Sequence, residues 1–209
     1  LFVHAHPDDE TINNGATMAQ LVSQGQDVHV LTCTRGEEGE ILVAELADLA
    51  SNAKDQLGKH RENELKNAMK ILGVRNFSFL GGNEIEFRDS GMMGTSANQR
   101  PDNFWNCDFE KAVEICAKLI CEIKPDVLIT YDEFGGQWDH VSPPSSTNRI
   151  GLHDKWGPGT RIPAILIHKK FTRDGLDDYT YDTTAILKTI ENHFHLSPMI
   201  DIENPSRYR

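Results

Sequence analysis

The stretch that decides the fold is LFVHAHPDDE, residues 1–10. A short apolar run ends at His4, and His6, Asp8 and Asp9 follow it at once. An apolar run bounded in this way predicts a buried strand. The acids that crowd its end repel one another unless a positive charge lies among them, and a bound cation removes that repulsion. The stretch therefore predicts a strand that ends in a charged site.

Beyond this stretch, strands and helices are predicted to alternate along the chain. Strands are expected at 1–4, 27–33, 77–80, 127–131 and 162–168, and helices at 11–25, 41–72 (two helices broken near Gly58), 109–123 and 181–193. Such alternation is typical of βαβ units. We expect an α/β fold, a Rossmann-like three-layer sandwich with a mostly parallel sheet and helices on both faces. Ligands bind such sheets at the carboxyl ends of the strands.

Composition limits the possible partners. The chain has 209 residues and a formal net charge of −11, which argues against nucleic acid and anionic membranes, because both attract clustered Lys and Arg. No stretch approaches the roughly 18 to 20 apolar residues that span a bilayer. The four cysteines form no CxxC pair, and Cys116 and Cys121 lie in an apolar helical run. Reduced core cysteines predict a cytoplasmic protein. The sequence does not indicate an oligomeric state.

The charged turn has the composition of a metal site. A histidine nitrogen on His6 and a carboxylate on Asp9 are both good ligands for Zn²⁺. Catalytic zinc takes a third protein ligand and leaves a position for water. His140, in GGQWDH after the strand at 127–131, is the candidate third ligand, and Asp8 would act as general base for the water. The alternative is an ordinary Pro-Asp turn with solvated acids.

Several motifs then match a known family in order: AHPDDE, VHVLTCTRGEEGE, DQLGKHRENEL, FLGG and PDVLITYD. Residues 1 to about 136 resemble the LmbE/PIG-L family of zinc-dependent N-deacetylases, and within it the mycothiol-pathway branch that acts on N-acetylglucosaminyl-inositol. This resemblance implies that His6, Asp9 and a later histidine bind zinc and that Asp8 is the base. It also implies that Arg61 and Asp89 bind the sugar. Without the resemblance, Arg61 is expected to pair with a helix neighbour such as Glu64.

The resemblance fails around residue 137. The family has approximately GGYGHPDH, whereas this chain has GGQWDH at 135–140. Asp139 and His140 keep the final pair, but the first histidine has no counterpart. Gln137 is a poor substitute, because an amide donates a hydrogen bond but no proton.

Residues from about 129 to 199 resemble the C-terminal part of the bacterial phosphoesterase family, which includes acid phosphatases and phospholipases C. That resemblance implies metal binding by Asp132 and Glu133. The N-terminal ligands and the nucleophile segment of that family have no match in this chain. We therefore expect a fusion, with a deacetylase-like domain at 1–136 and a phosphoesterase-like segment at 137–209 that completes the same sheet or is appended to it.

The leading functional hypothesis is a hydrolase with one Zn²⁺ per chain. It would remove the acetyl group from a small N-acetylglucosaminyl substrate of the inositol type by means of metal-activated water. Two alternatives stay open. The chain could be a metal-binding but catalytically impaired chimera, or a metal-dependent phosphoesterase that uses Asp132, Glu133 and His140.

Overall fold

The computed structural model describes residues 1–131, 164–168, 190, 192, 194 and 195. Leu1–Tyr131 form one compact unit, which also includes the last strand from Ile165 onward. The helix predicted at 181–193 lies almost wholly outside the described residues.

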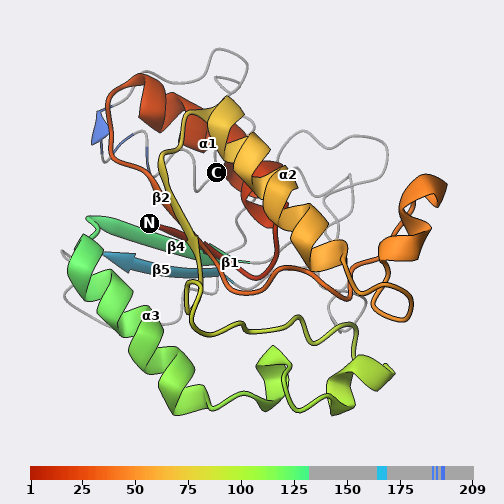
Figure 1. Cartoon of the computed structure of the whole chain (residues 1–209). Helices are drawn as coiled ribbons and strands as arrows, with labels where there is room; N and C mark the ends of the chain where they lie inside the picture. Colours follow the sequence, from red (N-terminus) through yellow and green to blue (C-terminus); the bar gives the residue numbers. More distant parts are fainter. Residues whose placement is uncertain (132–163, 169–189, 191, 193, 196–209) are drawn as a thin grey trace, which may run out of the picture. The chain divides into compact units, whose positions relative to one another are not determined.

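The centre of this unit is a five-stranded sheet in the order β3-β2-β1-β4-β5 (Figure 1). Strand β1 is parallel to both β2 and β4, and β2 is parallel to β3. The strands are β1 (Phe2–His4), β2 (His29–Thr32), β3 (Asn76–Phe79), β4 (Val127–Tyr131) and β5 (Ala164–His168). The chain adds β2 and β3 on one side of β1 and later adds β4 and β5 on its other side. The order in which the strands follow one another therefore reverses beside β1. That is where ligands bind in open α/β sheets.

Helices cover both faces of the sheet, so the predicted three-layer α/β sandwich is confirmed. Helices α1 (Asp9–Ser23) and α2 (Leu57–Leu72) lie on one face and α3 (Phe109–Ile123) lies on the other (Figure 1). Three short 3-10 helices complete the described elements, namely η1 (Ala44–Leu49), η2 (Ser96–Gln99) and η3 (Phe104–Asn106).

Helix α3 has the bounds that its sequence predicts, because the sequence marks both where the helix begins and where it ends. Asp108 caps its start by accepting a hydrogen bond from the Lys111 amide at 3.2 Å. Lys124 ends it in a left-handed conformation with φ of 51°. Pro125 follows and cannot continue the helix.

Apolar side chains fill both interfaces between the layers. Met18 and Leu21 of α1 and Leu65 and Met69 of α2 are buried in the helical layer that covers one face of the sheet. On the other face, a second buried cluster packs with partly buried residues of α3. It consists of Leu31, Leu80, Phe87 and Ala112.

The prediction of two helices within 41–72 is only half right. Residues 44–49 form η1, and no residue of η1 is buried, so it has no apolar face to pack. Gly58 does not break a helix but lies in the first turn of α2. A Cβ there would lie 2.7 Å from Glu37 Cγ and 3.2 Å from Arg35 Cβ. The glycine is needed for close approach to the loop after β2.

The four cysteines, all of which lie among the described residues, form no disulfide bond with one another, and Cys121 is exposed and is not a core residue. In the part of the chain that the structure describes, no helix is long and apolar enough to cross a membrane.

Candidate metal site at the carboxyl end of the sheet

His6 and Asp9 are brought together by the sharp turn between β1 and α1. The His6 amide donates a hydrogen bond of 2.8 Å to Asp9 Oδ2, and His6 Nδ1 lies 3.6 Å from the same oxygen. Asp9 begins α1 and Glu10 follows it in the first turn. The partial positive charge of a helix N-terminus favours carboxylates there. The sequence order strand, turn, helix therefore fixes both predicted ligands locally.

The carboxylate of Asp9 has an open coordination position. Asp9 is fully buried, and its Oδ1 has no hydrogen-bond partner within the described ranges. Burial alone would raise the pKa of Asp9, but its pairing with the His6 ring and amide lowers it, so the carboxylate stays ionised. A buried charged oxygen without a partner is costly. A cation that binds Asp9 Oδ1 and His6 would remove this cost, so the two residues fit a zinc ion.

Asp89 approaches His6 from the other side. It lies in the long loop after β3, and its Oδ1 is 3.6 Å from His6 Nε2. Burial would lower the pKa of His6, but Asp89 and Asp9 more than offset this and raise it to about 10. Asp89 is itself buried, and the pairing lowers its pKa. The structure thus brings the predicted sugar ligand Asp89 next to the predicted metal ligand His6.

Asp8, the predicted base, lies beside this pair and is exposed to solvent. Arg61 Nη2 donates to Asp8 Oδ2 at 2.6 Å and also to the carbonyl of Pro7. Burial raises the pKa of Asp8, and the Arg61 charge opposes this rise. The alternative pairing of Arg61 with Glu64 is wrong, because Glu64 lies 3.3 Å from His60 and Arg61 points into the site.

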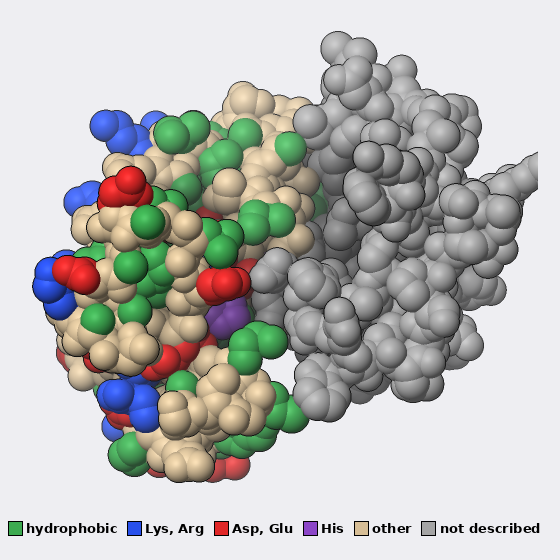
Figure 2. All heavy atoms as spheres, turned by 90° about the vertical axis from the view of Figure 1, so that its right-hand side faces the viewer, with side chains coloured by type: hydrophobic (Ala, Val, Ile, Leu, Met, Phe, Trp, Pro, Cys, Tyr) green, Lys and Arg blue, Asp and Glu red, His purple; other side chains and the backbone are tan. Residues whose placement is uncertain are grey.

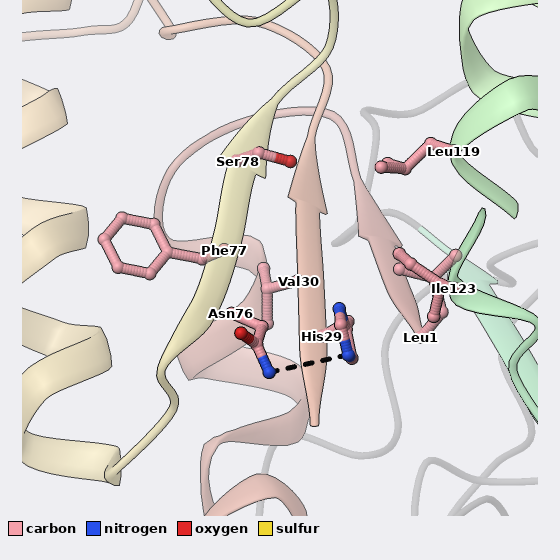
Figure 3. Close-up of a pocket in the computed structure, with 8 residues that line it drawn as sticks. All are labelled: Leu1, His29, Val30, Asn76, Phe77, Ser78, Leu119 and Ile123. Atoms are coloured by element: carbon pink, nitrogen blue, oxygen red, sulfur yellow. Dashed lines mark hydrogen bonds between the residues drawn. The ribbon is translucent and has the colours of Figure 1, made fainter. Parts of the chain in front are cut away.

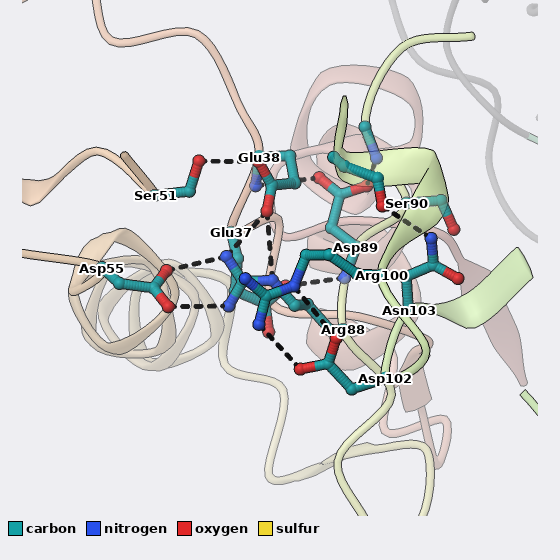
Figure 4. Close-up of polar contacts among 12 residues, drawn as sticks. Glu37, Glu38, Ser51, Asp55, Arg88, Asp89, Ser90, Arg100, Asp102 and Asn103 are labelled. Atoms are coloured by element: carbon teal, nitrogen blue, oxygen red, sulfur yellow. Dashed lines mark hydrogen bonds and ion pairs between the residues drawn. The ribbon is translucent and has the colours of Figure 1, made fainter. Parts of the chain in front are cut away.

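The loop after β2 contributes residues that contact Asp89 and that sequence reasoning missed. Glu37 accepts a hydrogen bond of 2.9 Å from the Asp89 amide, and the Glu38 amide donates to Asp89 Oδ2 at 3.3 Å (Figure 4). Burial raises the pKa of Glu37, against the effect of the Asp89 amide. The signal was present in TRGEEGE, where adjacent acids follow a strand at the ligand-binding edge. Their partner, Asp89, lies about 50 positions further along the chain, so the sequence did not show that these acids contact it.

Five further site residues are not placed by the structure. His140, the predicted third zinc ligand, lies outside the described residues, as do Asp132, Glu133, Gln137 and Asp139. Among the residues that are described, no group of three or more His, Cys, Asp or Glu side chains is arranged to hold a metal ion. The described chain thus offers two fitting donors and an incomplete coordination set.

The space-filling view shows histidine at the surface among acidic side chains, on a face where acidic, basic and hydrophobic side chains are interspersed (Figure 2). A pocket of about 280 Å³ lies elsewhere, at the amino ends of β1, β2 and β3 (Figure 3). Leu119 and Ile123 of α3 line one side of it, and His29 and Asn76 line another. None of the predicted site residues lines this pocket, so it does not coincide with the candidate metal ligands His6 and Asp9. We assign the site to the opposite, carboxyl end.

Two family models match the sequence. The PIG-L family, described as GlcNAc-PI de-N-acetylase, matches residues 1–149. The Phosphoesterase family matches residues 124–197. The first match covers more than half of the chain, so the chain belongs to the GlcNAc-PI de-N-acetylase family. The predicted resemblance to both families is confirmed, and the two matches overlap around the end of β4.

Curated relatives carry a more specific name. The 1D-myo-inositol 2-acetamido-2-deoxy-alpha-D-glucopyranoside deacetylase of Geodermatophilus obscurus is 56% identical over 143 residues, which are 68% of this chain and 48% of that protein. The protein of the same name from Kribbella flavida is 54% identical over 150 residues, 68% of this chain and 49% of that protein. The chain spans about half the length of these relatives.

Among solved structures, the N,N'-diacetylchitobiose deacetylase of Pyrococcus horikoshii, in complex with an inhibitor, matches with a TM-score of 0.43 and 21% identity. The match covers 60% of this chain and 37% of that one.

Proposed function

We propose that this chain is a zinc-dependent N-deacetylase that acts on an N-acetylglucosaminyl compound of the inositol type. The observation that carries the proposal is the buried carboxylate of Asp9, whose Oδ1 has no hydrogen-bond partner among the described residues and which lies beside His6 and Asp8. Membership of the de-N-acetylase family and the names of the curated relatives support the reaction and the substrate class.

His6 and Asp9 would hold the zinc ion, with His140 as the third ligand. When bound, the zinc ion supplies Lewis acidity to the acetamide carbonyl and to a water molecule. Asp8 accepts the proton of the attacking water while the water oxygen bonds to the acetamide carbon. The carbon–nitrogen bond then breaks, and the proton held by Asp8 passes to the leaving nitrogen. Acetic acid and a free amine result, and transfer of the carboxyl proton to the amine gives acetate and an ammonium group. Asp8 is assigned both proton steps because Gln137 can donate a hydrogen bond but no proton.

Arg61 and Asp89 would bind the sugar on either side of these groups. A guanidinium donates to hydroxyl oxygens in a fork, and a carboxylate accepts from hydroxyl protons. Both side chains are largely buried and face the turn that carries His6 and Asp8. Residues 1–136 would form the deacetylase-like domain, and residues 137–209 would contribute His140 to the same site.

The test is metal content, measured by mass spectrometry on the purified chain and on His140→Ala. About one zinc per chain is expected in the unchanged protein, with a large loss in the variant. His29→Ala is the matched control, because His29 lies at the amino end of β2, away from the proposed site. This variant protein should keep its zinc. Acetate release from N-acetylglucosaminyl-inositol is then measured.

Full zinc retention in His140→Ala would contradict the proposed ligand set. Zinc without acetate release would favour the impaired chimera. The match at residues 124–197 favours one further candidate, a metal-dependent phosphoesterase. Hydrolysis of p-nitrophenyl phosphate by the same preparation, in the absence of acetate release, would favour that candidate.

A further inference from the structure

Asp89 is held by reciprocal hydrogen bonds between two loops that are far apart in sequence. Its amide donates to Glu37 Oε2 at 2.9 Å, and its own Oδ2 accepts from the Glu38 amide at 3.3 Å. Its Oδ1, the oxygen nearer to His6, accepts from the Gly91 amide at 2.9 Å. Both carboxylate oxygens and the backbone of Asp89 are therefore fixed from within the protein (Figure 4).

The neighbouring residue, Arg88, joins the same two loops through its side chain. Arg88 Nη2 lies 2.7 Å from Glu38 Oε1 and 2.7 Å from Asp55 Oδ1, and Nη1 lies 3.1 Å from Asp55 Oδ2 (Figure 4). Ser51 Oγ donates to Glu38 Oε2 at 2.7 Å and steadies the acceptor. We call Glu38, Arg88 and Asp55 the Arg88 bridge.

The Arg88 bridge is more than a surface ion pair. The side chains of Arg88 and Glu38 are only 12% and 11% exposed, so water screens their attraction less than it screens an exposed pair. Burial would lower the pKa of Arg88, but Asp55 and Glu38 raise it above its usual value. A planar guanidinium can meet both acids at once, whereas an ammonium cannot reproduce this fork.

The backbone of Arg88 is anchored as well. Its amide donates to the Asp102 carbonyl at 3.4 Å, and its carbonyl accepts from the Phe104 amide at 2.7 Å. With side chain and backbone of Arg88 both fixed, the adjacent Asp89 has little freedom beyond its own side-chain rotation. The Glu38 and Gly91 amides remove that freedom too.

We propose that the Arg88 bridge positions Asp89 for substrate binding by locking the loop after β3 onto the loop after β2. This inference rests on the proposed function, because it takes Asp89 as a sugar ligand. Arg88 and Glu38 are positioning residues and not catalytic residues, because the groups assigned to proton transfer and to the metal are Asp8, His6 and Asp9. Loss of the bridge should therefore weaken substrate binding more than the chemical step.

The first experiment compares Arg88→Lys with Arg100→Lys. Arg100 lies in the same loop and forms a similar pair with Asp102, but this pair is exposed and is not bonded to Asp89. Arg88→Lys should raise KM by ~10-fold or more with a smaller change in kcat, since small displacements of positioning groups can cost up to about 10²-fold. Zinc content should not change. Arg100→Lys should match the unchanged protein in all three quantities.

The second experiment does not depend on activity. Hydrogen exchange at the Asp89 and Glu38 amides is measured in the same variants and in Glu38→Gln, which keeps the side-chain volume and an acceptor for Ser51. Both amides should exchange faster in Arg88→Lys and in Glu38→Gln, while amides of β1 and β2 keep their protection. If Arg88→Lys does not fold, Glu38→Gln carries the comparison with Arg100→Lys.

Unchanged exchange in the bridge variants would overturn the inference, and so would faster exchange with an unchanged KM. If the unchanged protein releases no acetate, the proposed function fails on its own. The exchange data then still decide whether the Arg88 bridge fixes Asp89.

Discussion

Asp8 combines a strained backbone with a proposed chemical role. Its φ of 126° and ψ of −35° lie outside the regions that residues other than glycine normally adopt. Such a conformation costs about 1–3 kcal/mol and persists only where surrounding contacts enforce it. Glu10 accepts from the Asp8 amide at 3.0 Å, Arg61 binds its carboxylate, and its carbonyl accepts from two amides of α1. The strain therefore falls on the residue that is proposed to act as the general base.

Asp8→Asn should reduce the rate of acetate release by about 10²–10⁴-fold, the usual contribution of a general base. Asparagine keeps the volume and one oxygen for Arg61, so the turn should keep its shape. The measurement is kcat for deacetylation, with zinc content as the control. A rate close to that of the unchanged protein, at equal zinc content, would show that another group takes the proton.

At the scale of elements, helix α2 extends the Arg61 side chain to the turn that carries Asp8. Arg61 passes beside the loop after β2, and Arg61 Nη1 donates to the Gly36 carbonyl at 3.3 Å. A Cβ at Gly36 would overlap the Arg61 guanidinium, and one at Gly39 would lie 2.9 Å from Arg61 Nη1. The glycines of TRGEEGE thus leave room for an arginine that comes from another element.

Gly36→Ala tests this fit against Gly82→Ala. Both glycines have positive φ, 67° and 63°, so both substitutions carry a similar backbone cost of roughly 1–2 kcal/mol. Only at Gly36 would the new Cβ meet a neighbour, since nothing lies within 4 Å at Gly82. We expect KM for the sugar to rise ~10-fold or more in Gly36→Ala alone, because Arg61 must move. Equal KM values in the two variants would contradict this role.

How far the sequence predicts the structure depends on how many positions of sequence separate the interacting residues. His6 and Asp9 were predicted because a single strand-turn-helix segment carries both, and α3 was predicted because Asp108 and Pro125 mark its ends. Residues 44–49 were misassigned because a helical pattern forms an α-helix only where a surface packs against it. Glu37, Glu38 and Arg88 were missed because their partners lie in other loops.

At the scale of the whole molecule, ion pairs join the helical layer to the sheet. Arg35, in the loop after β2, is buried and stacks over the Phe79 ring at 4.7 Å. It also pairs with Glu62 of α2. Burial would raise the pKa of Glu62, but Lys59 and Arg35 lower it below its ordinary value of 4.5. The stability of the unit should therefore depend on the ionisation of this one carboxylate.

A carboxylate whose pKa is lower in the folded chain adds stability above its unfolded pKa, and that stability is lost as the pH falls through the folded value. Glu62→Gln should thus unfold at lower denaturant concentration than the unchanged protein at pH 7, and the difference should shrink below about pH 4.5. Glu64→Gln is the control on the same helix, because Glu64 is exposed and pairs only weakly with His60. Urea unfolding midpoints at several pH values measure this difference. A difference in unfolding midpoint between Glu62→Gln and the unchanged protein that does not vary with pH would contradict the role given to the ionised Glu62 carboxylate.

The pairing of β1 with β4 has a consequence for how the chain folds. Phe2 is opposite Ile129, and the amino group of Leu1 donates to the Val127 carbonyl at 2.9 Å across 126 positions of sequence. Closing so long a loop carries an entropic cost before any contact rewards it, and sheets built from distant pairings form slowly. The turn with His6 and Asp9 precedes β4 along the chain, so during synthesis β1 gains its second neighbour only after residue 131 has emerged. The strand that leads into the proposed metal ligands is thus completed late in the folding of this unit.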